Sequence, residues 1–492
     1  MYDIVVLGAG ASATAFLQSI KKLAQMSGGI ESPLKVAVID RQSQYGTGRV
    51  YQQDYEWLIM NTPVEDLSCV YDDSSHLANW LKKEVSTSSK YISRNLFGLY
   101  LARCLESVCE SLSVHFINDT VVDVEPIVES SSNVVSISLT SGDRFQSKAI
   151  VFATGYPLDL KEDLYGIENV TKSLYPLQSN LPCLEKNEVL VFGTSLSSVD
   201  VISTCHHLEY DCKITICSRT GSLPNVKGQV IEPVQPKFCL YSEYYKDYRN
   251  KGCALSLRDI LRRVRLELKS HCIDWRSYLF PKRGIEDQIS IFRRRLDSAR
   301  TGNSSFDLVL GMIPEIAETW ALVDTSQLRL FMEKFQSRIR AIHGAIPLHN
   351  AQLLANKLDN GTVRLSQLPS SLVERNGKHI ATFPDGGQKV YDHVIFATGS
   401  RRSLKFHTDS LIRATLNKLT DKPYTEFGAE VHLPSGRLCN SGGHNLYAIG
   451  HASEGSHPFM NNFGWIVKSS HMSAKAIIKK LRESTNNESL FS

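Results

Sequence analysis

The chain has 492 residues, which is enough for two or three domains with well-buried cores. Its 55 basic side chains nearly balance 51 acidic ones, and a net charge of +4 gives no support for a protein that binds nucleic acid or an acidic membrane surface. No apolar run approaches the roughly 18 residues of a spanning helix, the first residues already read as a core strand rather than a signal peptide, and the eleven cysteines are odd in number and scattered. We therefore expect a cytoplasmic protein with reduced thiols.

The N-terminus carries a dinucleotide-binding pattern. An apolar strand over residues 1–7 leads into a turn in which Gly8 permits the tight bend and Gly10 lets the backbone approach a pyrophosphate. Ala13 is small enough for the following helix to pack on the strand, and the N–H groups at the helix start can hold the anion. A second apolar strand ends at Asp40, which is placed to bind a ribose hydroxyl. These features together predict an FAD-type dinucleotide site.

A second strand–turn–helix pattern begins at residue 188. The turn contains small residues, but serines replace two of the usual glycines and narrow the approach of the backbone to phosphate. The next strand ends in a hydroxyl and a guanidinium, which suit a ribose 2′-phosphate and favour NADPH over NADH. A degenerate unit that no longer binds nucleotide is the alternative. The candidate NADPH contacts are Gly193, Ser195, Ser198, Ser218 and Arg219.

Cys212 and Cys217 have a spacing that is also seen in redox-active pairs. They flank an alternating strand segment, and we favour cysteines that fill a core over a redox pair.

A pseudo-repeat joins the two patterns. The runs 149–155 and 393–399 each read as a buried strand that ends in Ala-Thr-Gly, where glycine lets the chain pass close to a bound cofactor. In this respect the sequence resembles flavoproteins with two dinucleotide-binding domains. Those proteins carry such a strand where the polypeptide passes from one domain to the other. The resemblance implies an α/β fold with two Rossmann-like domains and an inserted helical segment. The expected pieces are 1–160 (FAD domain), 161–390 (NADPH domain, helical insertion at about 240–347), 391–482 (FAD domain) and 483–492 (flexible tail).

The C-terminal piece supplies further expected flavin contacts. A strand over 445–450 precedes a helix from near Asn462 through Lys480, whose positive end would point at the flavin. In the resembling folds an aspartate after the strand glycine often binds the ribityl chain, but His451 stands here. The candidate FAD contacts are Gly8, Gly10, Ala13, Asp40, Arg41, Met60, Thr154, Gly155, Gly450, His451, Phe463 and Gly464.

The segment from about 241 to 347 is expected to be helical and rich in arginine. Apolar stripes at helical spacing predict three helices, the last marked by Phe331, Phe335, Ile339 and Ile342. Solvated arginine faces are the default interpretation of such helices.

Residues 45–51, 58–68, 76–81 and 91–101 carry a family resemblance. They resemble the bacterial FAD/NAD(P)-binding flavoproteins that include nitrosuccinate synthases, which are similar in layout to the ornithine and lysine N-monooxygenases. The resemblance implies that NADPH reduces FAD, that O2 adds to form a C4a-hydroperoxyflavin, and that one oxygen passes to an amine nitrogen in a water-poor pocket.

The resemblance also suggests site residues. Asn61 is a candidate contact for the flavin edge, with an asparagine that satisfies a turn before Pro63 as the alternative, and Asn462 is a second catalytic candidate with an equally plausible structural role. An amino-acid substrate brings a carboxylate, which calls for arginine. Arg276 and Arg283, in a loop-like stretch, and Arg94 could supply it. No metal-ligand spacing appears among the fifteen histidines.

The leading interpretation is an FAD- and NADPH-dependent monooxygenase of an amino-acid or amine nitrogen, in specialised biosynthesis. A flavin dehydrogenase or oxidase with a relic NADPH domain, and a non-catalytic cofactor-bound sensor, are the alternatives. The sequence leaves open the substrate, the number of oxidations, the function of the second site and the oligomeric state.

Overall fold

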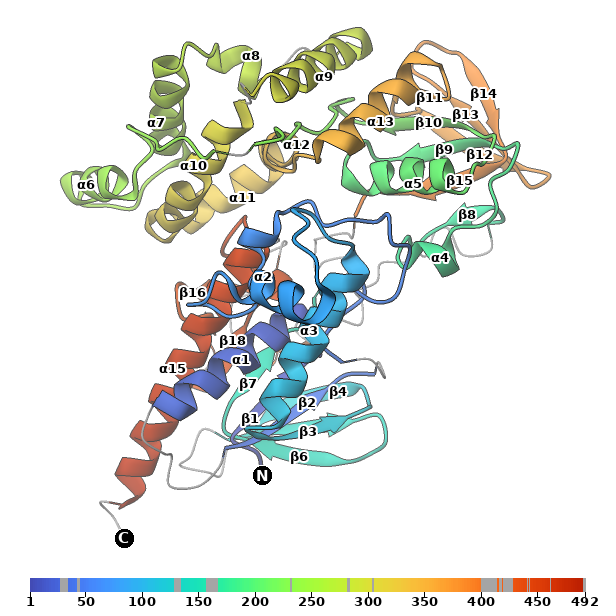
Figure 1. Ribbon diagram of the computed structural model, residues 1–492. Coiled ribbons are helices and arrows are strands. Elements are labelled where there is room, and N and C mark those ends of the chain that lie inside the picture. Colours follow the sequence, from blue (N-terminus) through green and yellow to red (C-terminus); the bar gives the residue numbers. More distant parts are fainter. Residues whose placement is uncertain are drawn as a thin grey trace. The chain divides into compact units, whose positions relative to one another are not determined.

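The computed structural model divides into two compact units (Figure 1). Unit 1 comprises residues 1–53, 62–159 and 400–492, and unit 2 comprises residues 54–61 and 160–399. Each unit is described by itself. The structure describes residues 1–26, 34–41, 45–127, 134–155, 167–230, 232–280, 284–302, 305–399, 414–415, 418, 428–439, 441, 443–460 and 462–489.

Unit 1 is built on a sheet of seven described strands in the order β16-β17-β18-β7-β1-β2-β3. The five from β18 to β3 run parallel, and the central strands β1 and β7 are short apolar runs that are fully buried. The bounds are β1 (Ile4–Leu7), β2 (Lys35–Ile39), β3 (Ser113–Ile117), β7 (Ile150–Phe152), β16 (Val431–His432), β17 (Arg437–Leu438) and β18 (Leu446–Ala448).

Alternate residues of this sheet enter two separate cores. Ile4 and Val6 pack under α1 (Ala11–Met26), which lies beside the long helix α15 (Phe463–Ser489) (Figure 1). Val5 and Leu7 face a three-stranded antiparallel sheet of β4 (Val121–Pro126), β5 (Val135–Leu139) and β6 (Arg144–Ser147). Unit 1 also contains η1 (Val64–Asp66), α2 (His76–Trp80), η2 (Leu81–Val85), α3 (Arg94–Cys109) and η6 (Gly450–Ser453).

Helix α15 continues to Ser489 and so extends past the end predicted near Lys480. None of the described helices is long and apolar enough to cross a membrane.

Unit 2 contains a parallel five-stranded sheet in the order β11-β10-β9-β15-β8. The sequence-based boundary at residue 390 lies before β15, whereas the pairing of β15 with β9 places this strand in unit 2. The bounds are β8 (Val170–Thr171), β9 (Glu188–Phe192), β10 (Lys213–Ser218), β11 (Val363–Gln367) and β15 (His393–Phe396). The short helix α4 (Leu177–Asn180) and the helices α5 (Leu196–His207) and α13 (Leu348–Asp359) complete this part, together with the antiparallel strands β12 (Ser371–Arg375), β13 (Lys378–Thr382) and β14 (Gln388–Tyr391).

Cys217 of β10 and Cys212, which directly precedes this strand, fill cores, as predicted. Cys217 is fully buried, and burial raises the pKa of its thiol to about 12. Cys212 is also buried, and its hydrogen-bond partner is Cys205 of α5 rather than Cys217.

The helical segment of unit 2 differs from its prediction in two details. The expected third helix is two helices that meet at Phe335, and the stretch around Arg276, expected as loop, forms the short helix α8. The bounds are α6 (Tyr241–Lys251), α7 (Leu257–Ser270), α8 (Trp275–Leu279), α9 (Ile285–Arg300), α10 (Ser305–Thr319), η4 (Trp320–Leu322), α11 (Thr325–Lys334) and α12 (Gln336–His343).

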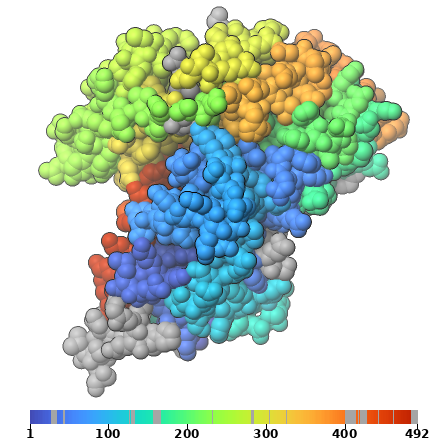
Figure 2. All heavy atoms as spheres, viewed as in Figure 1, coloured from blue at the N-terminus to red at the C-terminus, as the bar shows by residue number. Residues whose placement is uncertain are grey.

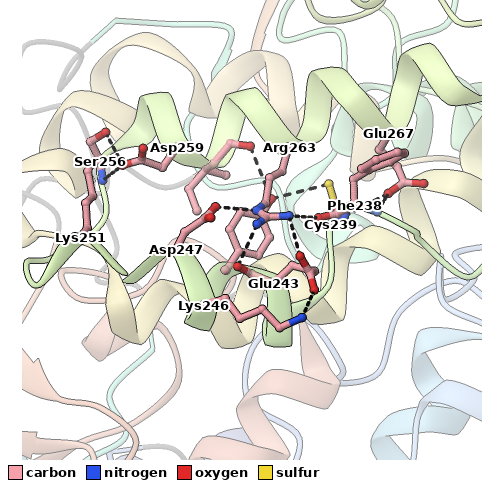
Figure 3. Close-up of polar contacts among 12 residues, drawn as sticks. Phe238, Cys239, Glu243, Lys246, Asp247, Lys251, Ser256, Asp259, Arg263 and Glu267 are labelled. Carbon is pink, nitrogen blue, oxygen red and sulfur yellow. Dashed lines mark hydrogen bonds and ion pairs between the residues drawn. The ribbon is translucent and has the colours of Figure 1, made fainter. Parts of the chain in front are cut away.

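Two charged side chains of α7 fasten the segment that enters these helices (Figure 3). The Glu267 carboxylate is fully buried and accepts hydrogen bonds from the backbone N–H groups of residues 237–239 at 2.6–3.0 Å. Burial acts to raise the pKa of Glu267, but these hydrogen bonds outweigh it and lower the pKa. Arg263 bonds the carboxylate of Asp247 at 2.7 Å. Arg263, one of the arginines of these helices, therefore makes internal contacts instead of facing solvent.

Candidate dinucleotide-binding sites

The first turn of unit 1 is built around Gly8. This residue has φ +100°, and a β-carbon added to it would lie 2.6 Å from the carbonyl oxygen of Ala153. The Ala-Thr-Gly segment after β7 therefore passes directly against the turn, as its glycine-rich sequence predicts. The Gly8 N–H donates to the carbonyl of Ile39 at 2.8 Å, which joins the turn to the end of β2.

The second glycine of this turn leaves the space that a phosphate needs. A β-carbon on Gly10 would be 3.4 Å from the α-carbon of Gly48, so two glycines face each other at the start of α1. Ala13 is buried where α1 packs on the sheet. The cradle that side chains at these positions would fill, next to a helix N-terminus, fits the pyrophosphate of a dinucleotide.

Charged groups gather at the end of β2. One carboxylate oxygen of Asp40 accepts a hydrogen bond from the Ala9 N–H at 2.8 Å. Arg41 is exposed and lies near Arg49, a residue that the sequence analysis does not single out. Burial, and then the charge of Arg41, lowers the pKa of Arg49. An arginine after a small-residue turn, as in Gly46 to Arg49, is the signal that could have identified it.

The C-terminal piece of unit 1 reaches the same helix start. Gly450 has φ +59°, and a β-carbon there would lie 2.3 Å from the hydroxyl oxygen of Ser12 on α1. Thr154 is exposed, and Gly155 has φ +67° with open space around its α-carbon. His451 is half-buried in η6. The structure thus brings the predicted residues from all three sequence regions of unit 1 to the first turn of α1 or the strand ends beside it.

Asn462 and Phe463 have structural contacts at the start of α15. The side-chain oxygen of Asn462 accepts a hydrogen bond from the Trp465 N–H at 3.3 Å, so it caps the helix. Phe463 is buried against Phe97 with ring centroids 5.1 Å apart. Gly464 lies in the first turn of the helix.

Three further described candidates are Met60, Asn61 and Arg94. Met60 and Asn61 belong to unit 2, where the buried Lys227 ammonium donates a hydrogen bond to the main-chain carbonyl of Asn61. Arg94 is buried at the first position of α3 in unit 1, and its charge acts on Tyr51, whose pKa is raised mainly by burial. No local pattern singles out Lys227, because lysine is ordinarily a surface residue.

The turn after β9 in unit 2 repeats the first turn with one change. Gly193 has φ +127°, and a β-carbon there would lie 2.4 Å from the carbonyl oxygen of Ala397. Ser195, at the position equivalent to Gly10, is exposed with extended backbone at the N-cap of α5. Ser198 is buried under the turn, and its hydroxyl has no hydrogen-bond partner among the described residues. The turn fits a second dinucleotide, with the side chain of Ser195 where the first turn has Gly10.

The end of β10 is held by a hydroxyl cluster. Ser218 accepts hydrogen bonds from the Thr194 hydroxyl and the Gly221 N–H, both at 3.0 Å, so its oxygen partly serves to close the turn. Thr194 is a further residue that the sequence analysis does not identify. Arg219 is exposed. The guanidinium is therefore the group most available to a 2′-phosphate.

The proposed substrate arginines of the helical segment are only partly described. Arg276 is exposed on α8 with its guanidinium 4.9 Å from the ring centroid of Trp275, and Arg265 lies 5.0 Å from the same ring. Arg283 lies outside the described residues.

A cavity of about 270 Å³ lies between α5 and α13 in unit 2. The indole of Trp57 stacks on Tyr55 and His207 beside it. Burial lowers the pKa of His206 and His349, which favours neutral imidazoles. The sequence analysis does not predict this cavity, which is lined by Trp57, Ile59, Ser203, His206, His207, His349, Asn350 and Leu353.

Comparisons with known proteins agree with this geometry. Residues 5–157 match a family model described as FAD-NAD(P)-binding. A search of curated protein sequences gives no significant match. Among solved structures, L-lysine 6-monooxygenase from Pseudomonas syringae is similar with a TM-score of 0.60 and 14% identity, covering 97% of this chain and 99% of that one.

Two further structures are similar over nearly the whole chain. Ornithine hydroxylase from Pseudomonas aeruginosa has a TM-score of 0.58 and 13% identity, with 98% of this chain and 100% of that one covered. The cadaverine monooxygenase of Erwinia amylovora, bound to FAD, has a TM-score of 0.58 and 11% identity, with coverage of 97% and 94%. The chain has the fold of these monooxygenases. The predicted α/β fold of a two-dinucleotide flavoprotein is therefore confirmed.

Proposed function

We propose that the protein is an FAD- and NADPH-dependent monooxygenase that oxidises the amine nitrogen of an amino acid or a similar small amine. The observation that carries the proposal is the pair of glycine turns, Gly8 against Ala153 and Gly193 against Ala397, in a chain that shares its fold with amine-oxidising monooxygenases over nearly its whole length. Two separate dinucleotide cradles match an enzyme that uses two dinucleotides in one reaction.

When bound, NADPH and FAD would supply hydride transfer and the activation of O2. The chain's own residues then have to bind and orient. Gly8, Gly10 and the start of α1 would receive the FAD pyrophosphate, and Asp40 the ribose. Ser195 and Arg219 would receive the phosphates of NADPH. Asn61 and Asn462 are our candidates for contacts near the reacting atoms, with Lys227 holding the backbone of Asn61 in place.

The substrate class is the finer part of the proposal. The resemblance of residues 58–68 to the family that includes nitrosuccinate synthases favours an amino acid, whose carboxylate needs a cationic partner. Of the candidate substrate arginines that the structure describes, Arg276 is exposed and Arg94 is buried. An exposed guanidinium is free of the desolvation cost of a buried one, so we favour Arg276.

The deciding experiment is anaerobic mixing of the purified FAD-loaded protein with NADPH or NADH, with flavin absorbance followed in time, and then admission of O2 in the presence of an amine panel. Reduction that prefers NADPH, followed by formation of an oxygenated amine, is the expected result. Reduction by an amine substrate but not by nicotinamide would identify instead a dehydrogenase or oxidase with a relic second domain, the outcome that Ser195 in place of glycine favours. Absence of turnover with every donor and amine would leave the cofactor-bound sensor.

A further inference from the structure

Four reactive side chains meet in unit 1 beneath the surface turn that joins η1 to α2. Cys69 lies in this turn and His76 begins α2. Tyr100 and Cys104 are four residues apart on α3 and therefore lie on the same face of the helix. The sequence analysis does not link these residues, because they come from three separate segments.

The four side chains form a connected hydrogen-bond cluster. The hydroxyl oxygen of Tyr100 accepts from the Cys69 N–H at 3.0 Å and lies 2.8 Å from Nδ1 of His76. The sulfur of Cys104 is hydrogen-bonded to the Cys69 thiol, to His76 and to Tyr100. Cys69 and Tyr100 are fully buried, and Cys104 is nearly so. Two thiols thus act on each other within one polar cluster.

This arrangement differentiates the two sulfurs. The Cys69 thiol, and then the other two partners, outweigh burial and lower the pKa of Cys104, whereas the contact with Cys104 and burial raise the pKa of Cys69. His76 gains a higher pKa mainly from its hydrogen bond to Cys104, with Asp73 raising it further and Lys21 opposing. The cluster therefore favours a thiolate at Cys104 and a neutral thiol at Cys69.

The turn above the cluster lies at the surface of unit 1. Tyr71 and Asp72 are exposed, and Tyr71 stacks on His471 of α15 with ring centroids 4.2 Å apart. The blue surface of residues around α2 and α3 faces the viewer in Figure 2.

We propose that Cys104 and Cys69 form a reversible thiol–disulfide site that is oxidised by hydrogen peroxide. The Cys104 thiolate attacks one peroxide oxygen, the O–O bond breaks, and the leaving hydroxide takes a proton to become water. The Cys69 thiol then loses its proton and attacks the Cys104 sulfenic sulfur, which expels the hydroxyl group as a second water and forms the S–S bond. The two sulfurs supply the two electrons that reduce the peroxide.

Unit 2 offers an internal reference for this site. Cys205 and Cys212 are also buried and hydrogen-bonded to each other, and the charged groups that act on Cys212 are Lys357, Glu185 and Asp211. The largest influences on Cys212 are Cys205, burial and charged side chains, whereas those on Cys104 include His76 and Tyr100. We expect it to oxidise more slowly than the pair in unit 1.

The test is oxidation of the full FAD-loaded chain with stoichiometric hydrogen peroxide at pH 7, followed by alkylation and peptide mapping of all eleven cysteines. The expected result is a Cys69–Cys104 disulfide that forms before any other and that dithiothreitol reverses. In Cys69→Ser, which lacks the second thiol, Cys104 should instead be captured as a sulfenic acid by dimedone.

Two histidine variants separate chemistry from packing. His76→Phe keeps a ring but removes a hydrogen-bond donor, so it should slow disulfide formation about tenfold through the smaller thiolate fraction. His471→Phe, at the same turn but outside the cluster, should leave the rate unchanged. Circular dichroism checks that both variants are folded. The proposal is overturned if the wild type forms no Cys69–Cys104 disulfide, if Cys205–Cys212 forms as fast, or if a folded His76→Phe reacts at the wild-type rate.

Discussion

Unit 1 and unit 2 each place a glycine of positive φ at the end of a strand, and each presses that glycine against the alanine carbonyl of an Ala-Thr-Gly segment. They differ at the next turn position. Unit 1 has Gly10, where an added β-carbon would contact the backbone of Gly48, whereas unit 2 has the exposed Ser195. They also differ at the end of the second strand, where Asp40 closes one turn and the Ser218 hydroxyl the other. The two units thus share the close approach of the turn glycine to the Ala-Thr-Gly segment. They differ in the side chains that would contact the ligand.

The largest effect is expected from Gly8→Ala. Its β-carbon would overlap the Ala153 carbonyl, so the turn and the crossing segment must separate. We expect FAD retention to fall at least about tenfold and the free energy of unfolding of unit 1 to fall by about 3 kcal/mol. The measurements are the FAD-to-protein ratio after desalting and the denaturant midpoint.

Gly142→Ala is the matched control for this change, because Gly142 has a similar φ of +93° but no atom within 4 Å of an added β-carbon. It should keep its FAD and lose only about 1–2 kcal/mol. Equal FAD loss in both variants would contradict the importance of the crossing.

Gly193→Ala should have the equivalent effect on the second ligand. The overlap with the Ala397 carbonyl lies in unit 2, so we expect FAD content to be unchanged and the Kd for NADPH to rise at least about tenfold. Equilibrium titration with NADPH measures it. Gly386→Ala, with φ +83° and open space, should bind NADPH normally. Loss of FAD in Gly193→Ala would show that the two turns are not independent.

Four residues before the alanine of each Ala-Thr-Gly segment stands Ala149 in unit 1 and His393 in unit 2. Burial, and then His379, lowers the pKa of His393 from 6.5 to about 4, and its Nε2 lies 2.8 Å from the Thr171 hydroxyl. Between these two pKa values the unfolded chain binds a proton at His393, whereas the folded unit 2 leaves this imidazole neutral. The free energy of unfolding therefore has its full value above pH 6.5 and decreases by up to about 3 kcal/mol as the pH falls towards 4.

Denaturant unfolding at pH 7.5 and 4.5 tests this pH dependence. His393→Gln, which cannot titrate, should lose less stability over the interval than the wild type. An identical loss in the two proteins would assign the pH dependence to other groups.

The smallest effect concerns coenzyme choice. Arg219→Gln removes the exposed cation at the end of β10 and should reduce the preference for NADPH over NADH about tenfold. Rates of anaerobic flavin reduction at subsaturating concentrations of each nucleotide give the preference. Arg364→Gln, an exposed arginine on the neighbouring strand β11, is the control. An unchanged preference in Arg219→Gln would remove this residue from the site.

The sequence predicts those parts of the fold that depend on local pattern. Gly8, Gly193 and the two Ala-Thr-Gly segments are recognisable because a tight turn and a close crossing restrict the residues that fit. The buried contacts of Lys227 and the cluster around Cys104 could not be predicted, since each depends on residues that are distant in sequence. Arg276 was expected in a loop, although the Asp274 cap and the apolar Leu279 give α8 its ends. The sequence leaves Asn462 as either a site residue or a structural one, and in the structure its side-chain oxygen caps α15.

The segment Asp54–Asn61 also bears on how such a chain could have evolved. It interrupts unit 1 for eight residues to complete the core of unit 2, where Leu58 is buried and the Asp54 carboxylate accepts hydrogen bonds from the N–H groups of Leu177 and Gln178. An inserted domain with one entry and one exit can be gained or lost in a single genetic event. Here residues 54–61, which interrupt the sequence of unit 1, supply part of the core of unit 2. Neither unit could therefore be exchanged for that of a homologue unless this segment matched as well.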